Sequence, residues 1–293
     1  MRLLKEKAGR TVMFILTVLP TLLLVLMFFG LFRKSRAILA LKSFGGLLFS
    51  SGWHPLRGEF GLFPFLIGTL WVTAVALVIA VPISLLMAVY LSEYAPRGFR
   101  DFAKPLIDLL SGIPSVIFGV WGVLVIVPLV GRIAPLFGRY SSGYSVLAGG
   151  IVLAVMIFPT IIHVALEVFS AIPFPLREAS LSLGATRWET TRHVVLRKGS
   201  QGIIAACVLG LSRALGETMA VLMVVGNVPA APKSVFDAGY PLPALIANNY
   251  GEILSVPLYD SALMLAALVL FIVVQTFNIL ARWFLVRAER RAE

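Results

Sequence analysis

The stretch Gly202-IIAACVLGLSRALGETMAVLMVV-Gly226 has the composition of a membrane-spanning helix but carries two charges, Arg213 and Glu217. On one continuous helix, a step of four residues turns the side chain by only about 40°, so both charges face the same side. An Arg at the centre of a spanning helix costs roughly 2.5 to 3.5 kcal/mol on insertion scales, so it needs a partner or a water-filled cavity. The pair therefore predicts either a charged element lining a transport pathway or a structural ion pair that locks two helices together.

The rest of the chain has the composition of an integral membrane protein. Of its 293 residues, 59% are hydrophobic and 13% are charged, whereas a soluble domain carries about 25% charged residues. Five further stretches reach the roughly 18 apolar residues that a spanning helix needs: Val12–Phe32, Phe63–Tyr90, Leu109–Val130, Tyr144–Leu166 and Ala262–Leu280. We therefore expect an all-α, polytopic membrane protein with six transmembrane helices, in contact with membrane lipid.

The net charge of +11 is explained by the distribution of Lys and Arg rather than by nucleic-acid binding. With the N-terminus inside, basic residues concentrate in the inner segments, as the positive-inside rule requires, and both termini are cytoplasmic. The cluster from Arg33 to Lys42 then falls outside, against the trend. The first apolar run is too long for a signal peptide and lacks a convincing cleavage site, so we interpret it as a retained anchor.

Two regions follow from this topology. Residues 1–62 form an N-terminal cytoplasmic segment, the first transmembrane helix and an outer loop, and residues 63–293 form a core of five transmembrane helices. The inner loop 171–201 is polar but contains Leu181, Leu183 and Trp188, spaced as in short amphipathic helices broken at Gly184. It is either a solvated loop or a docking helix for a cytoplasmic partner. The Pro-rich outer loop 227–260 fits a surface that faces an external partner or covers the pathway.

The chemistry absent from the sequence argues against an enzyme. There is no P-loop and no nucleophile–base constellation, and the single Cys207 offers neither a disulfide nor a thiolate metal site. His163, four residues before Glu167, is either a proton or ion contact or a packing residue near the cytoplasmic face. Asp108 is expected to pair with Lys104 in a local ion pair. Gly and Pro interrupt several spans, which is typical of a transporter core.

The inner loop resembles the signature of ABC importer permeases, Glu-Ala-Ala-x3-Gly-x9-Ile-x-Leu-Pro. The chain has Glu178-Ala179-Ser180, then Gly184, then Val194-x-Leu196-Arg197 at the same spacings, with Ser, Val and Arg replacing Ala, Ile and Pro. The resemblance implies the type I ABC importer permease fold. It also implies that contact with an ATPase is made by the matching positions, which are Glu178, Ala179, Ser180, Gly184, Val194 and Leu196.

Four other runs resemble the PstC-type permease subunit of the phosphate-specific ABC importer: Gly68-TLWVTAVALVIAVPIS, Tyr90-LSEYAP, Ile113-PSVIFGVWG and Arg213-ALGETMAVLMVVGN. The resemblance covers residues 52–285. It implies a bacterial or archaeal cytoplasmic (inner) membrane location and three partners: a second permease of the PstA type, a homodimeric ATPase of the PstB type and an external phosphate-binding protein of the PstS type. It implies no cofactor in this chain, since ATP and magnesium would bind to the ATPase.

In that family the intramembrane Arg and Glu are implicated in phosphate passage, which assigns the substrate pathway to Arg213 and Glu217. A guanidinium suits phosphate oxygens and stays charged, and Glu217 would hold it when the site is empty. An Arg–Glu pair does not choose among tetrahedral anions, so sulfate or molybdate remains an alternative substrate. A non-transporting protein that senses phosphate is a third hypothesis.

Overall fold

Helices make up nearly all of the fold in the computed structural model, which describes residues 2–251 and 256–289, and the side chains of residues 9–251 and 256–283. Five helical segments are long and apolar enough to cross a membrane: Gly9–Leu41, Phe63–Tyr94, Ser115–Phe137, Val146–Ala171 and Tyr259–Trp283. A bent pair, Arg187–Lys198 with Ser200–Gly216, meets the same criteria together and is the sixth candidate. The expectation of six membrane-length elements is confirmed for the described residues.

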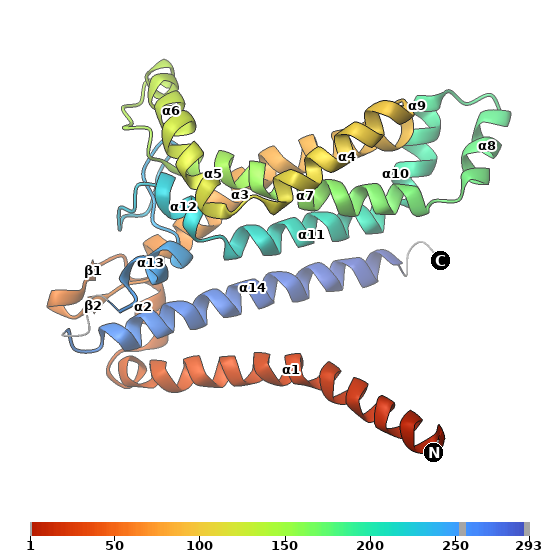
Figure 1. The fold of residues 1–293 in the computed structure, drawn as a ribbon. Helices are drawn as coiled ribbons and strands as arrows, with labels where there is room; N and C mark the ends of the chain where they lie inside the picture. Colours follow the sequence, from red (N-terminus) through yellow and green to blue (C-terminus); the bar gives the residue numbers. More distant parts are fainter. Residues whose placement is uncertain (1, 252–255, 290–293) are drawn as a thin grey trace.

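The longest helices lie side by side along one axis of the molecule (Figure 1). They are α1 (Arg2–Leu41), α3 (Phe63–Val89), α7 (Val146–Ala171), α11 (Ser200–Gly216) and α14 (Tyr259–Glu289). A π-helical turn, η2 (Tyr90–Tyr94), extends α3. The start of α1, the end of α14 and the loop after α7 lie at one end of the bundle (Figure 1). We call this the loop end, and the opposite end the hairpin end.

The close approach of α3 and α7 forms the centre of the bundle. A Cβ on Gly150 of α7 would lie 2.4 Å from Val75 Cγ1 of α3, so only glycine allows this spacing. Buried side chains of both helices join α11 and α12 (Met219–Val224) in one hydrophobic cluster that includes Val72, Ile157 and Ala206. This packing fixes the position of α11, the helix that carries Arg213.

The predicted third span, Leu109–Val130, is wrong at its start. Residues 109–112 belong to an amphipathic helix, α4 (Arg97–Gly112), which packs against α7. Pro114 disfavours helical backbone at the residue before it, and Ile113 is extended, with ψ 128°. The apolar segment begins after this break, with α5 (Ser115–Trp121), η3 (Gly122–Ile126), α6 (Val127–Ile133) and η4 (Ala134–Phe137).

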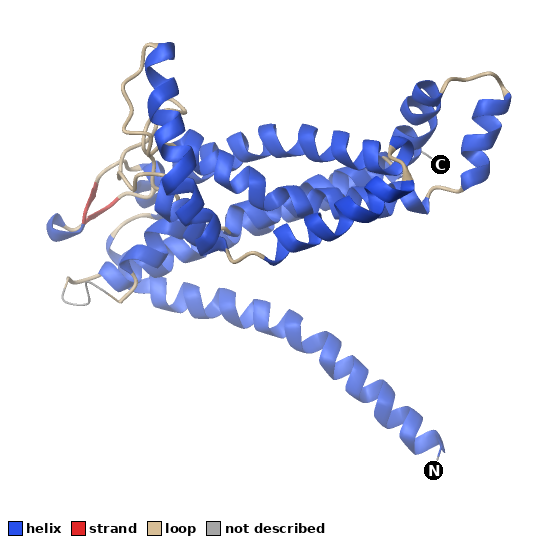
Figure 2. Cartoon of the chain, turned by 45° about the horizontal axis from the view of Figure 1, so that its top comes forward, coloured by secondary structure: helices blue, strands red, loops and turns tan. Residues whose placement is uncertain are grey.

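The first helix is longer than the predicted span and continues to Leu41, so the basic cluster that begins at Arg33 occupies its last turns. Ser261 ties this end of α1 to α14, because its hydroxyl accepts from Ile38 N (3.1 Å) and donates to Lys34 O (2.9 Å). Toward its beginning α1 leaves the bundle (Figure 2), and the residues from Gly9 to Met27 are exposed.

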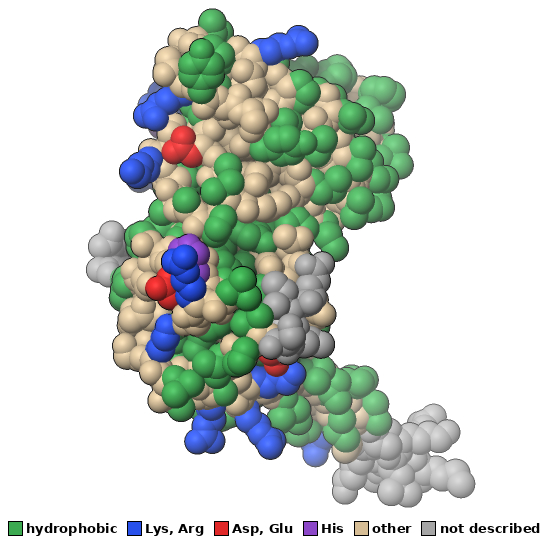
Figure 3. Space-filling view, turned by 90° about the vertical axis from the view of Figure 1, so that its left-hand side faces the viewer, with side chains coloured by type: hydrophobic (Ala, Val, Ile, Leu, Met, Phe, Trp, Pro, Cys, Tyr) green, Lys and Arg blue, Asp and Glu red, His purple; other side chains and the backbone are tan. Residues whose placement is uncertain are grey.

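Short elements close the hairpin end of the bundle. They are α2 (Phe44–Phe49), the antiparallel strands β1 (Trp53–His54) and β2 (Glu59–Phe60) around η1 (Pro55–Arg57), and α13 (Leu242–Asn249). Trp53 stacks edge-on against Phe65 of α3 with ring centroids 5.0 Å apart, and Leu242 is fully buried in the same hydrophobic cluster. The N-terminal region thus shares its core with the rest of the chain. Figure 3 shows this end, where separate Lys and Arg side chains stand among hydrophobic ones.

Candidate functional site

The predicted span Gly202–Gly226 is not one continuous helix, and its break lies at the charged residues. Helix α11 ends at Gly216, Glu217 is extended (φ −71°, ψ 130°), and α12 begins at Met219. The Thr218 hydroxyl donates to Gly216 O at 3.2 Å, which satisfies one carbonyl group freed at the break. Discontinuous membrane helices of this kind form substrate and ion sites in transporters.

Arg213 lies in the last turn of α11 and reaches across to α7. Its Nη1 donates to Thr160 Oγ1 at 2.6 Å, while the rest of the side chain is exposed on the surface of the single chain. Thr160 lies near the middle of α7, so the guanidinium is placed about halfway along a membrane-length helix. One hydroxyl leaves most of the five guanidinium N–H donors available for a ligand.

Glu217 is half-buried and lies at a small niche that is also lined by Thr69, Thr73, Pro241 and Pro243. Its Oε1 accepts from the Thr218 backbone N–H at 3.1 Å. No ion pair joins Arg213 to Glu217 among the side chains that the structure describes. The prediction that the two charges share one helix face as partners is therefore wrong, because the helix ends before Glu217.

The polar loop after α7 folds into the two short helical pieces that its sequence predicts. They are α8 (Phe174–Ser182) and a second piece built from α9 (Arg187–Thr190), η5 (Thr191–Val195) and α10 (Leu196–Lys198). The second piece meets α11 at a bend of 68°. The Ser180 and Thr190 hydroxyls lie 2.9 Å apart and link the two pieces. We call residues 174–198 the coupling loop.

Exposed side chains of this loop include large apolar ones, which a merely solvated loop does not require. Leu183 is 90% and Trp188 is 55% exposed. Of the motif positions, Glu178, Ala179 and Gly184 are exposed and Ser180 is half-buried. Val194 and Leu196 are half-buried, and Leu196 packs against the cluster around Phe169. The motif thus divides into exposed positions on and after α8 and packing positions beside α11.

Gly184 forms the turn between the two pieces with a left-handed backbone, φ +87°. A Cβ there would meet nothing within 4 Å, so the requirement for glycine is conformational rather than a matter of space. The next piece starts with a capping box, in which Thr186 Oγ1 accepts from Glu189 N (3.2 Å) and Glu189 Oε2 accepts from Thr186 N (2.7 Å).

Gly184→Ala is expected to strain this turn by about 1 to 2 kcal/mol, because a side chain disfavours the left-handed backbone. Gly184→Trp adds the same strain and a bulky group on the exposed loop. We expect reduced co-purification of an ATPase partner in both variants, and the larger loss with Trp. Gly98→Ala is the matched control, since Gly98 has ordinary helical backbone and open space around it. Unchanged co-purification and ATP-coupled uptake with Gly184→Trp would contradict a docking role for this turn.

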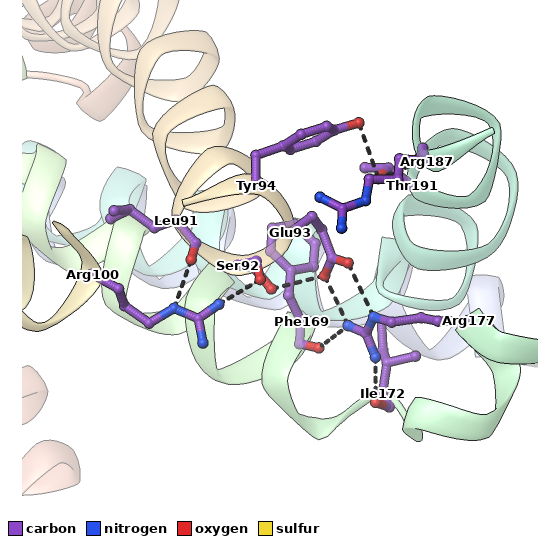
Figure 4. Close-up of polar contacts among 10 residues, drawn as sticks. All are labelled: Leu91, Ser92, Glu93, Tyr94, Arg100, Phe169, Ile172, Arg177, Arg187 and Thr191. Atoms are coloured by element: carbon purple, nitrogen blue, oxygen red, sulfur yellow. Dashed lines mark hydrogen bonds and ion pairs between the residues drawn. The ribbon is translucent and has the colours of Figure 1, made fainter. Parts of the chain in front are cut away.

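A buried ion pair holds the coupling loop to the bundle (Figure 4). Arg177 of α8 donates from Nε to Glu93 Oε2 (3.0 Å) and from Nη2 to Glu93 Oε1 (2.8 Å). The two side chains are only 14% and 12% exposed. Arg177 also donates to the carbonyl oxygens of Phe169 (2.8 Å) and Ile172 (2.7 Å) at the end of α7. We call this arrangement the Glu93–Arg177 clamp.

Arg100 of α4 binds the same π-helical turn, η2, on the side opposite Arg177 (Figure 4). Its Nε donates to Leu91 O at 2.7 Å and its Nη2 donates to Ser92 O. The Ser92 hydroxyl in turn donates to Glu93 Oε1 at 2.8 Å. The end of α3 is therefore joined by charge-assisted hydrogen bonds to both α4 and α8. A movement of α8 would be transmitted to α3 through these bonds.

Sequence reasoning missed Thr160 and the clamp. Thr160 gives no signal of its own, because a hydroxyl inside an apolar helix usually bonds to its own backbone. Glu93 could have been found, since it is an acidic residue closing a long run without charge. Its partner could not, because Arg177 lies 84 positions away and was one of many basic residues in a polar loop.

Membrane-length helices, one of them broken beside a charged residue, are the architecture of transport permeases. Residues 80–293 match the family "Binding-protein-dependent transport system inner membrane component", and the chain belongs to that family. It is similar to the phosphate transport system permease protein PstC of Xylella fastidiosa strain 9a5c, with 38% identity over 258 residues, 83% of this chain and 79% of the relative. It is also similar to the probable ABC transporter permease protein YqgH of Bacillus subtilis strain 168, with 37% identity over 80% of this chain and 76% of that protein.

Solved structures with a similar fold are ABC transporters. A chain of the bacterial alginate ABC transporter in complex with an alginate pentasaccharide-bound periplasmic protein has a TM-score of 0.64 and 16% identity, covering 94% of both chains. A chain of the inward-facing methionine transporter MetNI has a TM-score of 0.58 and 22% identity, covering 75% of this chain and 93% of that one. The fold is thus the type I ABC importer permease fold, in a multi-pass membrane protein.

Proposed function

We propose that this chain is the membrane-spanning permease subunit of an ATP-driven importer of inorganic phosphate. The observation that carries the proposal is the Arg213 guanidinium, which is held by one hydroxyl beside a helix break halfway along the bundle. Phosphate cannot enter hydrocarbon without replacement of its hydration, and a guanidinium fork replaces part of it. The names of the 35–38% identical PstC relatives support phosphate as the substrate.

Arg213 serves as a transient contact, and selectivity comes from an external binding protein. Its single side-chain bond to Thr160 leaves donors for the anion, and this hydroxyl replaces the anion as a partner after release. Glu217 keeps a role near the pathway through its charge at the break rather than through a direct pair with Arg213. The second permease, of the PstA type, completes the pathway on the exposed side of Arg213.

The exposed part of the coupling loop is the docking site for an ATPase of the PstB type, where ATP and magnesium bind. Glu178, Ala179 and Gly184 lie at its surface beside Leu183 and Trp188. The packing positions Val194 and Leu196, together with Ser180, hold the loop's second piece against the first and against the bundle. A phosphate-binding protein of the PstS type docks at the hairpin end. The start of α1 and the end of α14 lie at the same end as this site, which supports a cytoplasmic location for both termini.

The experiment is reconstitution of the chain with its permease, ATPase and binding-protein partners in proteoliposomes. Inorganic phosphate is expected to stimulate ATP hydrolysis and to accumulate inside, and an excess of sulfate or molybdate should leave both unchanged. Stimulation by sulfate or molybdate instead would assign the chain to another oxyanion. ATP hydrolysis without accumulation of any oxyanion would favour a phosphate sensor over a permease.

A further inference from the structure

A polar groove lies between α4 and α7, on the loop-end side of Arg213. Four residues of α7 lie on one face at helical spacing: Thr160, His163, Glu167 and Ser170. The first is the hydrogen-bond partner of Arg213. From Thr160 to Ser170 a helix rises about 15 Å, half the thickness of a bilayer core. The polar face thus spans the distance from Arg213 to the loop end.

Helix α4 presents a matching polar face to this groove. Arg97, Asp101, Lys104 and Asp108 follow one another at steps of four, three and four residues. The neighbouring face of α4 is apolar, and its Ala103 and Ile107 are buried in one cluster with Ile162 and Leu166 of α7. This packing holds Lys104 and Asp108 of α4 beside His163, Glu167 and Ser170 of α7.

The two polar faces line an open pocket. Its volume is about 250 Å³, and it is lined by Lys104, Asp108, His163, Leu166, Glu167 and Ser170. His163 Nε2 and Asp108 Oδ1 are 3.0 Å apart at its wall, with 40% and 65% of the two side chains exposed. Asp108 thus contacts His163 rather than Lys104, and the expected local pair with Lys104 is not formed. His163 lines the cavity instead of packing in the core.

Ionisable groups within a membrane-length helix are costly unless they face a water-filled path or the interior of an assembly. His163 and Glu167 are such groups: Glu167 is exposed, and 40% of the His163 side chain is exposed beside Asp108. We propose that this groove is the inner half of the anion pathway, through which an inorganic oxyanion passes from Arg213 to the loop end. The inference deepens the proposed function and rests on it.

The charged side chains of the groove favour passage of an anion over tight binding of it. Lys104 supplies a positive charge at the wall, where it attracts an anion that leaves Arg213. Asp108 and Glu167 lie beside it and repel the same anion, so neither Lys104 nor His163 holds it tightly. The groove is therefore a low-affinity exit route. Loss of Lys104 slows entry into it, and loss of Asp108 slows release from it.

Lys104→Gln is expected to lower phosphate uptake by the reconstituted complex about tenfold, because one charge-assisted contact to the anion is lost. Asp108→Asn should lower the maximal rate and make uptake more sensitive to phosphate on the inside. Arg282→Gln is the matched control, since it removes one exposed positive charge on α14, outside the groove. Uptake by Lys104→Gln equal to that of the control overturns the inference if the unaltered complex takes up phosphate. No uptake by the unaltered complex counts against the proposed function itself.

Thiol labelling tests the groove without substrate, because Cys207 is the only cysteine of the chain. In a Cys207→Ser background, Glu167→Cys and Ser170→Cys should react with a negatively charged, membrane-impermeant thiol reagent at least about tenfold faster than Leu86→Cys. Leu86 is an exposed apolar residue near the same end of α3. Phosphate should slow the reaction at Ser170→Cys. Labelling no faster than at Leu86→Cys means that the groove is closed to water and overturns the inference.

Discussion

Arg213→Ala is expected to reduce phosphate uptake about a hundredfold or more. A charge-assisted hydrogen bond is worth up to about 3 kcal/mol, and a guanidinium makes more than one to a phosphate. Insertion and assembly should be retained, since the change removes an intramembrane charge. Arg213→Lys keeps the charge but loses the planar fork, so it should recover only part of the rate. Initial uptake into proteoliposomes is the measurement.

The control for Arg213→Ala is Arg139→Ala, which removes an exposed Arg outside the helices. Uptake by this control should equal that of the unaltered complex. Thr160→Val tests the Arg213–Thr160 hydrogen bond separately from the charge of Arg213, because it leaves the guanidinium in place without its hydroxyl partner. We expect it to transport at a reduced rate above that of Arg213→Ala. Near-normal uptake by Arg213→Ala would refute a role for the residue in transport.

Arg177→Met is expected to give the largest loss of stability. It leaves Glu93 buried without its partner, a situation that costs about 3 to 5 kcal/mol, and it frees the carbonyl groups of Phe169 and Ile172. The purified complex should inactivate at a lower temperature, and any complex that remains should hydrolyse ATP without phosphate uptake. The double variant with Glu93→Gln should recover part of the thermal stability but not the coupling, because no charged bond then joins α8 to α3.

Glu59→Gln provides the comparison for the clamp. Its contact with His54 Nδ1 is equally short, 3.0 Å, but both side chains are more than half exposed, and exposed pairs contribute about 1 kcal/mol or less. We expect no measurable change in thermal inactivation or coupling. If Arg177→Met changes thermal inactivation and coupling no more than Glu59→Gln does, burial does not strengthen the Glu93–Arg177 clamp. The inference that the clamp links movement of α8 to α3 is then wrong.

Sequence periodicity and composition predicted most of the fold, because membrane spans are set by long apolar runs. Helix α7 begins two residues from its predicted start, and α3 begins where its run begins. The turn at Gly184 was also predictable, since a glycine between amphipathic segments marks a break. The resemblance to importer permeases predicted that the loop 171–201 binds an ATPase, and the exposed Leu183 and Trp188 agree with a surface that binds a partner.

The break at Glu217 was not predictable from the local sequence, where Glu and Met are ordinary helix residues. Its surroundings come from distant parts of the chain, since Thr69, Thr73, Pro241 and Pro243 line the same niche as Glu217. The same holds for the contacts of Arg213 with Thr160 and of Asp108 with His163, which join separate helices. A spacing of four residues predicts neighbours only while the helix continues between them.

The departure of α1 from the bundle has a consequence for biogenesis. Its exposed stretch, Gly9 to Met27, receives no support from the other helices, so its formation is independent of theirs. Such a helix is inserted as an autonomous unit and joins its neighbours in a second stage, here through the Ser261 contacts near its end.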